Sequence, residues 1–224
     1  MHLVDLEVNF MGSSPIVGNI IPLGVGLGLS IKIKKEKRIS TIFFGDGALE
    51  EGVFYESLNF AAVKSLPILF ICENNLYSVY SNLTERQPKN RKNYKMVKSI
   101  GVDSAYCDGF DIKKIYKIFN KGISYIRKKN KPFFIEFSSY RWREHCGPNF
   151  DNNIGYRTNN EYQKWKKKDP LPKLRKHLIK SSLGKKKIEL YENHVQKEIK
   201  EAFLYAEKSK FENIKKLKKY IYAK

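Results

Sequence analysis

Cysteine is scarce in this sequence, and no apolar run is long enough to span a bilayer. The 224 residues include three cysteines, Cys72, Cys107 and Cys146, whose spacing is not that of a metal or redox motif. An odd number of scattered thiols does not support a disulfide framework and favours a reducing compartment. The basic and then apolar pattern of a signal peptide is also missing. We therefore expect a cytoplasmic protein that does not contact a membrane.

Apolar and aromatic residues, in contrast, are plentiful. They make up 42% and 13% of the chain, which excludes a disordered polypeptide. The length suits one domain, or one domain with an extension, and is enough to bury a large core.

The positive charge is unevenly spread. Residues 1–84 hold 6 Lys and Arg against 8 Asp and Glu, whereas residues 85–224 hold 37 against 15. A basic half can bind nucleic acid or an acidic partner domain. However, no nucleic-acid motif accompanies the lysines, which fall mostly on polar faces of predicted helices. We favour solvent-exposed faces and expect no nucleic-acid partner.

The stretch Thr41–Tyr77 predicts a strand, a helix and a second strand. Thr41–Phe44 is a short apolar run, typical of a strand buried on both faces, and Gly45-Asp46-Gly47 then forms a tight turn. Ile68–Cys72 is the second strand. Such a βαβ unit has parallel strands and a right-handed crossover. The helix between them begins near Glu50, and its apolar face consists of Phe54, Leu58, Ala61 and Ala62.

Polar residues follow both strands. Asp46 comes after the first, and the pair Asn74-Asn75 follows the second. The carboxyl ends of parallel strands share one edge of the sheet, so Asp46 and Asn75 should lie close together. A carboxylate and an amide oxygen suit Mg²⁺. Gly47 and Ala48 begin the helix, whose free amides can hold phosphate oxygens. A lone Asp in such a turn could equally be a helix cap, but the paired Asn favours a magnesium–diphosphate site.

The remaining chain continues the alternation of helices and strands. This pattern predicts an α/β fold with a doubly wound parallel sheet, formed by residues 1–160, and a helical C-terminal extension over residues 161–224. The run after Asn75 reads as a long loop. The other predicted elements are a helix within Gly12–Ser30, a short helix at Tyr94–Ile100, strands at Val102–Cys107 and Pro132–Ser139, and a helix with Ile112, Ile115, Tyr116, Phe119, Ile123 and Ile126 on its apolar face.

A second polar loop follows the strand that ends at Ser139. It concentrates four side chains that suit an anionic ligand and proton transfer, namely Arg141, Arg143, His145 and Arg157. Because this loop also leaves the carboxyl edge of the sheet, it can reach the same site as Asp46. The tail after Pro170 is helical, with a heptad-like apolar stripe that suits docking on a subunit, and His177 and His194 are expected on the surface.

The combination of GDG and NN at this distance is the fingerprint of thiamine diphosphate enzymes. A longer segment around these motifs resembles the α subunit of the E1 component of 2-oxo acid dehydrogenases of the pyruvate, branched-chain and acetoin types. Its sequence is GDGALEEGVFYESLNFAAVKSLPILFICENNLYS. The resemblance extends from Met1 to about Pro170 and implies the thiamine diphosphate-binding fold. Met1-His2-Leu3 resembles the interior of a family segment, so we expect the family's amino-terminal portion to be lacking or supplied by another polypeptide.

The resemblance also assigns roles to particular residues. It implies that Mg²⁺ is held by Asp46, Asn75 and the Tyr77 carbonyl. It implies that Ile16, Val17 and Gly18 face the aminopyrimidine ring, that Gly47 and Ala48 lie at the diphosphate, and that Arg141 and His145 are catalytic residues, with His145 also beside the diphosphate. Glu50 and Glu51 match first-turn helix positions, and the carboxylate that activates the cofactor is expected on a β subunit.

The resemblance therefore predicts an α₂β₂ enzyme that decarboxylates a pyruvate-like 2-oxo acid oxidatively. The acyl group would pass to a lipoyl domain of an E2 acyltransferase, and the chain would be active only with its β subunit. Three alternatives remain open: a non-catalytic truncated α-like subunit, a basic binding module, and half of a split transketolase.

Overall fold

A computed structural model describes residues 2–211 and 213–217 of the chain. Met1 lies outside the described residues. It is the first residue of Met1-His2-Leu3, the segment that resembles an internal segment of the family. The chain divides into two compact units, Met1–Pro170 and Leu171–Lys224.

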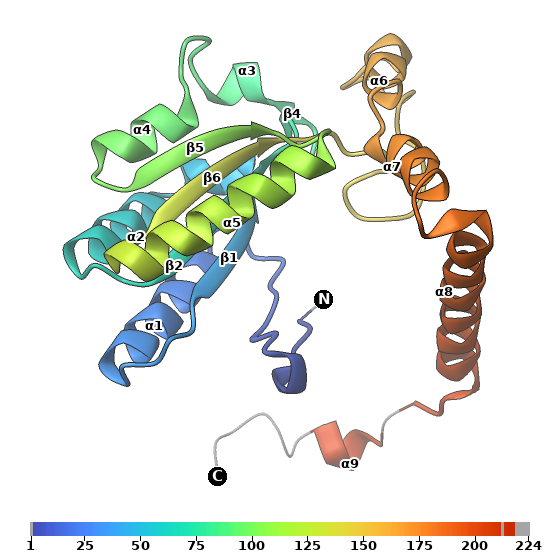
Figure 1. Ribbon diagram of the computed structural model, residues 1–224, viewed down its shortest axis with the longest axis horizontal. Coiled ribbons are helices and arrows are strands. Elements are labelled where there is room, and N and C mark those ends of the chain that lie inside the picture. Colours follow the sequence, from blue (N-terminus) through green and yellow to red (C-terminus); the bar gives the residue numbers. More distant parts are fainter. Residues whose placement is uncertain (1, 212, 218–224) are drawn as a thin grey trace. The chain divides into compact units, whose positions relative to one another are not determined.

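The first unit is built on a parallel sheet with the strand order β1-β2-β6-β5 (Figure 1). The register pairs Phe44 with Cys72 and Cys72 with Glu136, so the strands begin and end together. Each strand was expected from its apolar run, and the parallel α/β fold is confirmed. The strands are β1 (Ser40–Gly45), β2 (Ile68–Asn74), β5 (Asp103–Asp108) and β6 (Phe133–Ser138).

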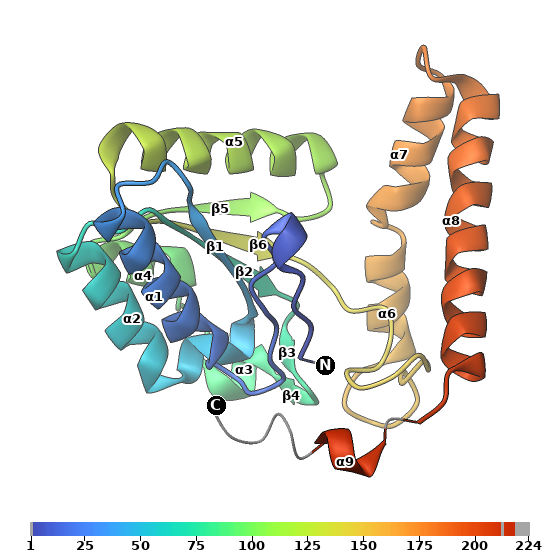
Figure 2. The ribbon, with the colours of Figure 1, turned by 90° about the horizontal axis from the view of Figure 1, so that it is seen from below.

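Helices cover both faces of this sheet (Figure 2), which confirms the doubly wound arrangement. On one face, α1 (Ile20–Ile33), α2 (Gly52–Val63) and α4 (Asn93–Ser99) enclose the larger core. On the other face, α5 (Ile112–Lys129) packs on β5, β6 and β2. The first core includes Ile21, Phe54, Leu58, Phe70 and Phe134, and the second includes Leu69, Ile71, Ile126 and Ile135.

Two glycines bring α1 unusually close to the sheet. A Cβ atom on Gly24 would lie 2.4 Å from Cγ1 of Ile42, and one on Gly28 would lie 2.5 Å from Cγ1 of Ile68. Gly26, between them, is exposed and meets nothing within 4 Å. Close packing therefore requires glycine at two of the three positions.

Two expectations about burial were wrong. The strand β1 is buried on one face only, and the side chain of Phe43 on its other face is 53% exposed. The reason is that β1 is the edge strand, whereas α5 packs on β5, β6 and β2. Tyr116 was expected on the apolar face of α5 but is 72% exposed, because it points away from the sheet while Ile115 and Phe119 pack against it.

The helix after the GDG turn begins later than expected. Gly47 and Ala48 lie in a short 3₁₀ helix, η2 (Asp46–Glu50), and α2 begins at Gly52. The predicted long loop after Asn75 is also partly ordered. It contains the hairpin of β3 (Tyr77–Ser78) and β4 (Ser81–Asn82), followed by α3 (Leu83–Arg86). The unit also contains η1 (Leu6–Val8) and α6 (Asn159–Lys166).

The second unit is helical, as expected, and consists of α7 (Pro170–Ile179), α8 (Gly184–Lys208) and α9 (Ile214–Leu217). Nε of Arg175 in α7 donates to Oε1 of Glu192 in α8 over 2.6 Å. Both His177 and His194 are exposed, as predicted. The apolar stripe of α8 is largely exposed, at Tyr191, Val195, Ile199 and Phe203. Within the described ranges, none of the helices has the length and apolar character needed to cross a membrane.

Candidate functional site

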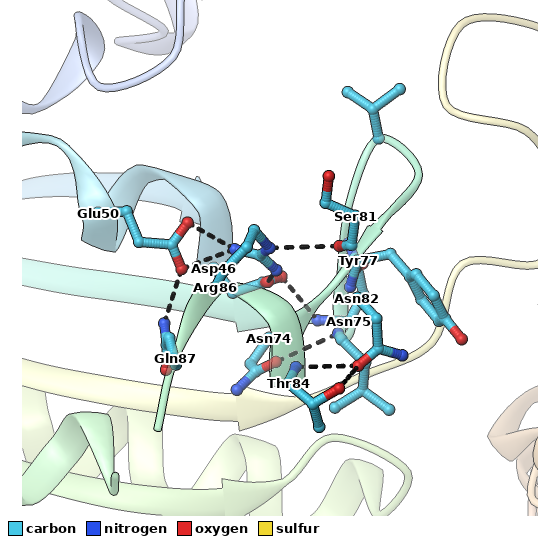
Figure 3. A network of polar contacts seen from close by, with 12 residues as sticks. Asp46, Glu50, Asn74, Asn75, Tyr77, Ser81, Asn82, Thr84, Arg86 and Gln87 are labelled. Carbon is cyan, nitrogen blue, oxygen red and sulfur yellow. Dashed lines mark hydrogen bonds and ion pairs between the residues drawn. The ribbon is translucent and has the colours of Figure 1, made fainter. Parts of the chain in front are cut away.

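The ends of β1 and β2 meet as the sequence predicts. Asp46 follows β1 directly, and its side chain is fully buried. Oδ1 of Asp46 accepts a hydrogen bond from the backbone N–H of Asn75 over 3.2 Å, as Figure 3 shows. The parallel register of β1 and β2 creates this contact across 29 positions of sequence.

The two asparagines shape the chain as it leaves β2. Oδ1 of Asn74 accepts from the N–H of Leu76 over 3.2 Å, and Oδ1 of Asn75 accepts from the N–H of Tyr77 over 3.1 Å. Such side-chain turns let Leu76 adopt a positive φ of 73°. The side-chain oxygen of Asn75 is therefore held in a fixed direction by the N–H of Tyr77, while the backbone N–H of Asn75 contacts Asp46.

The guanidinium of Arg86 lies against the same carboxylate. Nη2 of Arg86 donates to Oδ2 of Asp46 over 2.5 Å, and Nη1 lies 2.7 Å from each carboxylate oxygen of Glu50. Burial alone lowers the pKa of Arg86, but the hydrogen bonds to Glu50 and Asp46 outweigh it and raise the pKa. Arg86 therefore stays charged and links α3 to the turn after β1.

The hairpin of β3 and β4 packs directly on the GDG turn. A Cβ atom on Gly47 would lie 2.5 Å from Oγ and 3.0 Å from Cβ of Ser78. Only glycine allows the backbone of the turn and the hairpin to approach this closely.

The side chains at this edge fit a hard cation better than a soft one. Asp46 offers a carboxylate, Asn75 an amide oxygen and Tyr77 a backbone carbonyl, which are the ligand types that Mg²⁺ prefers. Among residues 2–211 and 213–217, there is no group of three or more His, Cys, Asp or Glu that could hold a metal ion. A site of mixed oxygen donors is therefore the arrangement that these residues support.

The loop after β6 reaches the same hairpin. Nη2 of Arg141 donates to the Val79 carbonyl and to the Tyr156 hydroxyl, each over 2.9 Å. Nη1 of Arg141 lies 3.5 Å from Nδ1 of His145, whose ring is exposed. The structure thus brings Arg141 and His145 together at the edge that also carries Asp46 and Asn75.

The other two arginines of this loop each have a partner within the loop. The side chain of Arg157 is fully buried and pairs with Asp151. Arg143 lies over the ring of Phe150, with 3.9 Å from its Cζ atom to the ring centroid. The grouping of Arg141, Arg143, His145 and Arg157 was therefore wrong for Arg157, because its side chain is buried in an ion pair with Asp151. Arg143 remains exposed.

The segment with Ile16, Val17 and Gly18 lies beside the start of α2. Gly18 has a φ of 80°, and a Cβ atom there would lie 3.1 Å from Cγ of Glu51 and 3.2 Å from Cγ1 of Val53. The side chains of Ile16 and Val17 are 61% and 55% exposed. The segment is thus placed next to the residues that follow the GDG turn, with two apolar side chains open to contact.

Tyr77 joins the hairpin to α6. Its hydroxyl donates to Oε2 of Glu161 over 2.8 Å, and its ring packs in an aromatic cluster with Tyr140 and Tyr162. Burial, and then the hydrogen bond to Glu161, raise the pKa of Tyr77. The tyrosine side chain therefore has a structural partner, and its carbonyl is the group that the chain offers to a metal.

Four residues that complete this region could not be assigned to it from local sequence patterns. Arg86 and Glu161 lie in stretches without clear periodicity, and Glu50 was considered only as a first-turn helix residue. Glu136 lies inside an apolar strand, where its contact with Asn74 could not be anticipated. Their partners lie 36 to 84 positions away.

Comparison with known proteins agrees with this architecture. The profile of the family described as "Dehydrogenase E1 component" matches residues 1–215. A pyruvate dehydrogenase E1 component subunit alpha of Rickettsia bellii is 31% identical over 223 residues, which cover 99% of this chain and 67% of the relative. The corresponding protein of Rickettsia felis is 32% identical over 210 residues, which cover 93% of this chain and 63% of the relative.

The chain thus spans about two thirds of the length of these curated relatives. A chloroplastic pyruvate dehydrogenase E1 component subunit alpha-3 of Arabidopsis thaliana is 30% identical, and the match covers half of that protein. A solved structure from Mycobacterium smegmatis, described as a thiamin diphosphate-dependent enzyme, has a TM-score of 0.47 at 18% identity and covers 59% of this chain and 24% of that one. The match over residues 1–215 and the identity to these relatives show that the chain belongs to the dehydrogenase E1 component family.

Proposed function

We propose that this chain is the α-type component of a thiamine diphosphate- and Mg²⁺-dependent 2-oxo acid dehydrogenase E1 enzyme that acts on a pyruvate-like substrate. The observation that carries the proposal is the contact of 3.2 Å between the backbone N–H of Asn75 and the buried carboxylate of Asp46. The relatives that are pyruvate dehydrogenase E1 alpha subunits support the same activity.

We assign the metal to Asp46, to Oδ1 of Asn75 and to the carbonyl of Tyr77. The amides of Gly47 and Ala48, in the turn after Asp46, would bind the diphosphate. When bound, thiamine diphosphate supplies the nucleophilic carbon and the electron sink for decarboxylation of a 2-oxo acid. The chain's own contribution is to fix this cofactor through its anionic end.

We assign binding of the aminopyrimidine ring to Ile16, Val17 and Gly18, since two of these offer exposed apolar side chains. Arg141 would orient His145, whose Nδ1 lies 3.5 Å from the guanidinium. Exposed imidazole can then move a proton at the mouth of the site or bind the anionic end of the cofactor.

The same proposal includes partners. A β-type subunit would complete an α₂β₂ enzyme, and a lipoyl domain of an E2 acyltransferase would accept the acyl group. In this scheme residues 1–160 bind the cofactor and residues 161–224 serve assembly. The exposed apolar side chains of Tyr191, Val195, Ile199 and Phe203 on α8 support a role in assembly, because such a stripe is stabilised by a partner.

Calorimetric titration tests this function. The chain is co-expressed with a candidate β-type chain, and thiamine diphosphate is titrated with and without Mg²⁺. We expect Mg²⁺-dependent binding that Asp46→Ala abolishes. The control Asp103→Ala removes a carboxylate at the opposite edge of the sheet, at the start of β5, and should bind as the unmodified protein does. Equal affinity of the Asp46→Ala variant would refute the site.

A further inference from the structure

Arg86 is the one cationic side chain that the structure places on Asp46 among the described residues. The side chain of Asp46 is 1% exposed and that of Arg86 is 12% exposed, so water does little to weaken their pairing. Oδ1 of Asp46 is already used by the backbone of Asn75, and Oδ2 is used by Arg86. Each oxygen keeps a second lone pair, so a metal ion bound through Asp46 would lie beside one or both of these donors.

The two donors differ in how easily they can leave. The N–H of Asn75 directly follows β2 (Ile68–Asn74), a central strand that is held by its register between β1 and β6. Arg86 ends the four-residue helix α3, and its long side chain can rotate. A divalent cation and a guanidinium also repel one another. Of the two donors, Arg86 is thus the one that a metal ion at Asp46 would displace, and it would do so at Oδ2.

A second carboxylate is available to Arg86 after displacement. Both oxygens of Glu50 lie 2.7 Å from Nη1, and Nε donates to the Ser81 carbonyl over 3.2 Å. Nε2 of Gln87 also donates to Glu50, over 2.9 Å. Arg86 can therefore release Asp46 without losing all of its partners, and the cluster of Asp46, Glu50 and Arg86 carries one formal negative charge in excess.

We propose that Arg86 competes with the divalent cation for Oδ2 of Asp46, so that metal affinity and the position of the segment 81–87 are coupled. This inference rests on the proposed function, because it takes Asp46 as a metal ligand. Metal binding shifts Arg86 wholly onto Glu50 and loosens α3 from the GDG turn. Linkage is reciprocal, so the factor by which metal binding weakens the contact of Arg86 with Asp46 is also the factor by which that contact weakens metal binding.

Titration of the full 224-residue chain with Mn²⁺, followed by electron paramagnetic resonance at 0.15 M salt, measures this competition. Arg86→Gln should bind Mn²⁺ about 5- to 150-fold more tightly than the unmodified chain, the usual range of such coupling. The control Lys89→Gln removes the same charge from an exposed position three residues away. At this ionic strength the control should change affinity less than about twofold, because exposed charges are screened within about 8 Å. Affinity in Arg86→Gln that is equal to or weaker than in the control would overturn the proposal.

The double variant Asp46→Asn with Arg86→Gln separates this inference from the proposed function. If it keeps the tight Mn²⁺ site, Asp46 is not a ligand, and both proposals fail. If it loses Mn²⁺ while Arg86→Gln alone gives no gain, the metal site stands and only the competition is refuted.

Hydrogen exchange gives a readout that does not depend on activity. The N–H of Gln87 donates to the Leu83 carbonyl over 2.9 Å and reports on α3. Saturating Mn²⁺ should speed its exchange in the unmodified chain and should have no effect in Arg86→Gln. Unchanged exchange in the unmodified chain at saturation would contradict the coupling.

Discussion

Oε1 of Glu136 in β6 lies 2.8 Å from Nδ2 of Asn74 at the end of β2. The same carboxylate accepts from Nδ2 of Asn93 over 3.3 Å and from the N–H of Tyr94 over 3.2 Å, and its residue is only 4% exposed. One buried acid thus joins the strand that carries Asn75 to the first turn of α4. All three groups that form these hydrogen bonds with it are donors.

Glu136→Gln should destabilise the protein by about 1–3 kcal/mol, because the new amide group points a donor at other donors in a buried place. The free energy of unfolding of the whole chain in urea measures this loss. Glu56→Gln is the matched control, since Glu56 is exposed on α2 and its replacement should cost less than about 0.5 kcal/mol. Equal stability of the two variants would show that Glu136 does not hold these elements together.

Two of the three glycines in α1, Gly26 and Gly28, allow predictions of opposite sign. Gly28→Ala places a methyl group 2.5 Å from Cγ1 of the buried Ile68 and should cost about 1–3 kcal/mol through overpacking. Gly26→Ala meets nothing within 4 Å and should stabilise the helix by about 0.5–1 kcal/mol. Thermal unfolding of the full chain distinguishes them. Shifts of the same sign in both variants would mean that α1 does not approach β2 as closely as described.

The elements of the first unit were predictable where apolar residues repeat. Local sequence patterns predict β1, β2, β5, β6 and the main helices, and the βαβ connection predicts that Asp46 lies beside Asn75. These predictions succeed because burial of apolar residues is a local pattern, and because parallel strands share an edge.

Contacts that depend on the reach of single side chains were not predictable. Arg86 and Asp46 are 40 positions apart and are joined through a hairpin with strands of two residues, too short to leave a pattern. The exposure of Phe43 depends on which strands α5 covers, and the burial of Arg157 depends on Asp151 within the same irregular loop. Each requires the tertiary arrangement, which local periodicity does not contain.

The loop after β6 contains a buried ion pair that should make stability depend on acid. Asp151 is 2% exposed, pairs with the buried Arg157 and accepts from the Tyr156 hydroxyl over 2.5 Å. Arg141 also faces it, 3.9 Å away. Burial alone raises the pKa of Asp151, but hydrogen bonds from Tyr156 and Arg157 outweigh it, and the pKa falls below its usual value of 3.8.

A carboxyl group whose pKa is lower in the folded than in the unfolded chain stabilises the fold at pH values above its unfolded pKa. This contribution is lost as the pH falls through the folded pKa, so for Asp151 the loss begins near pH 3.8 and continues below it. Asp151→Asn lacks the contribution at every pH and leaves the charge of Arg157 without its carboxylate partner, which should cost about 3–5 kcal/mol at pH 7.

The difference between the unmodified chain and Asp151→Asn isolates this residue, because all other acids titrate in both proteins. Unfolding free energies are measured in urea between pH 7 and pH 2.5. The difference between the two proteins should stay constant down to about pH 4 and should shrink below that pH. Protonated Asp151 leaves Arg157 as poorly paired as asparagine does, which is why the two curves should converge. If the difference in unfolding free energy between the two proteins stays constant to pH 2.5, Asp151 is not the acid that pairs with Arg157. The loop that carries Arg141 and His145 would then not depend on this ion pair.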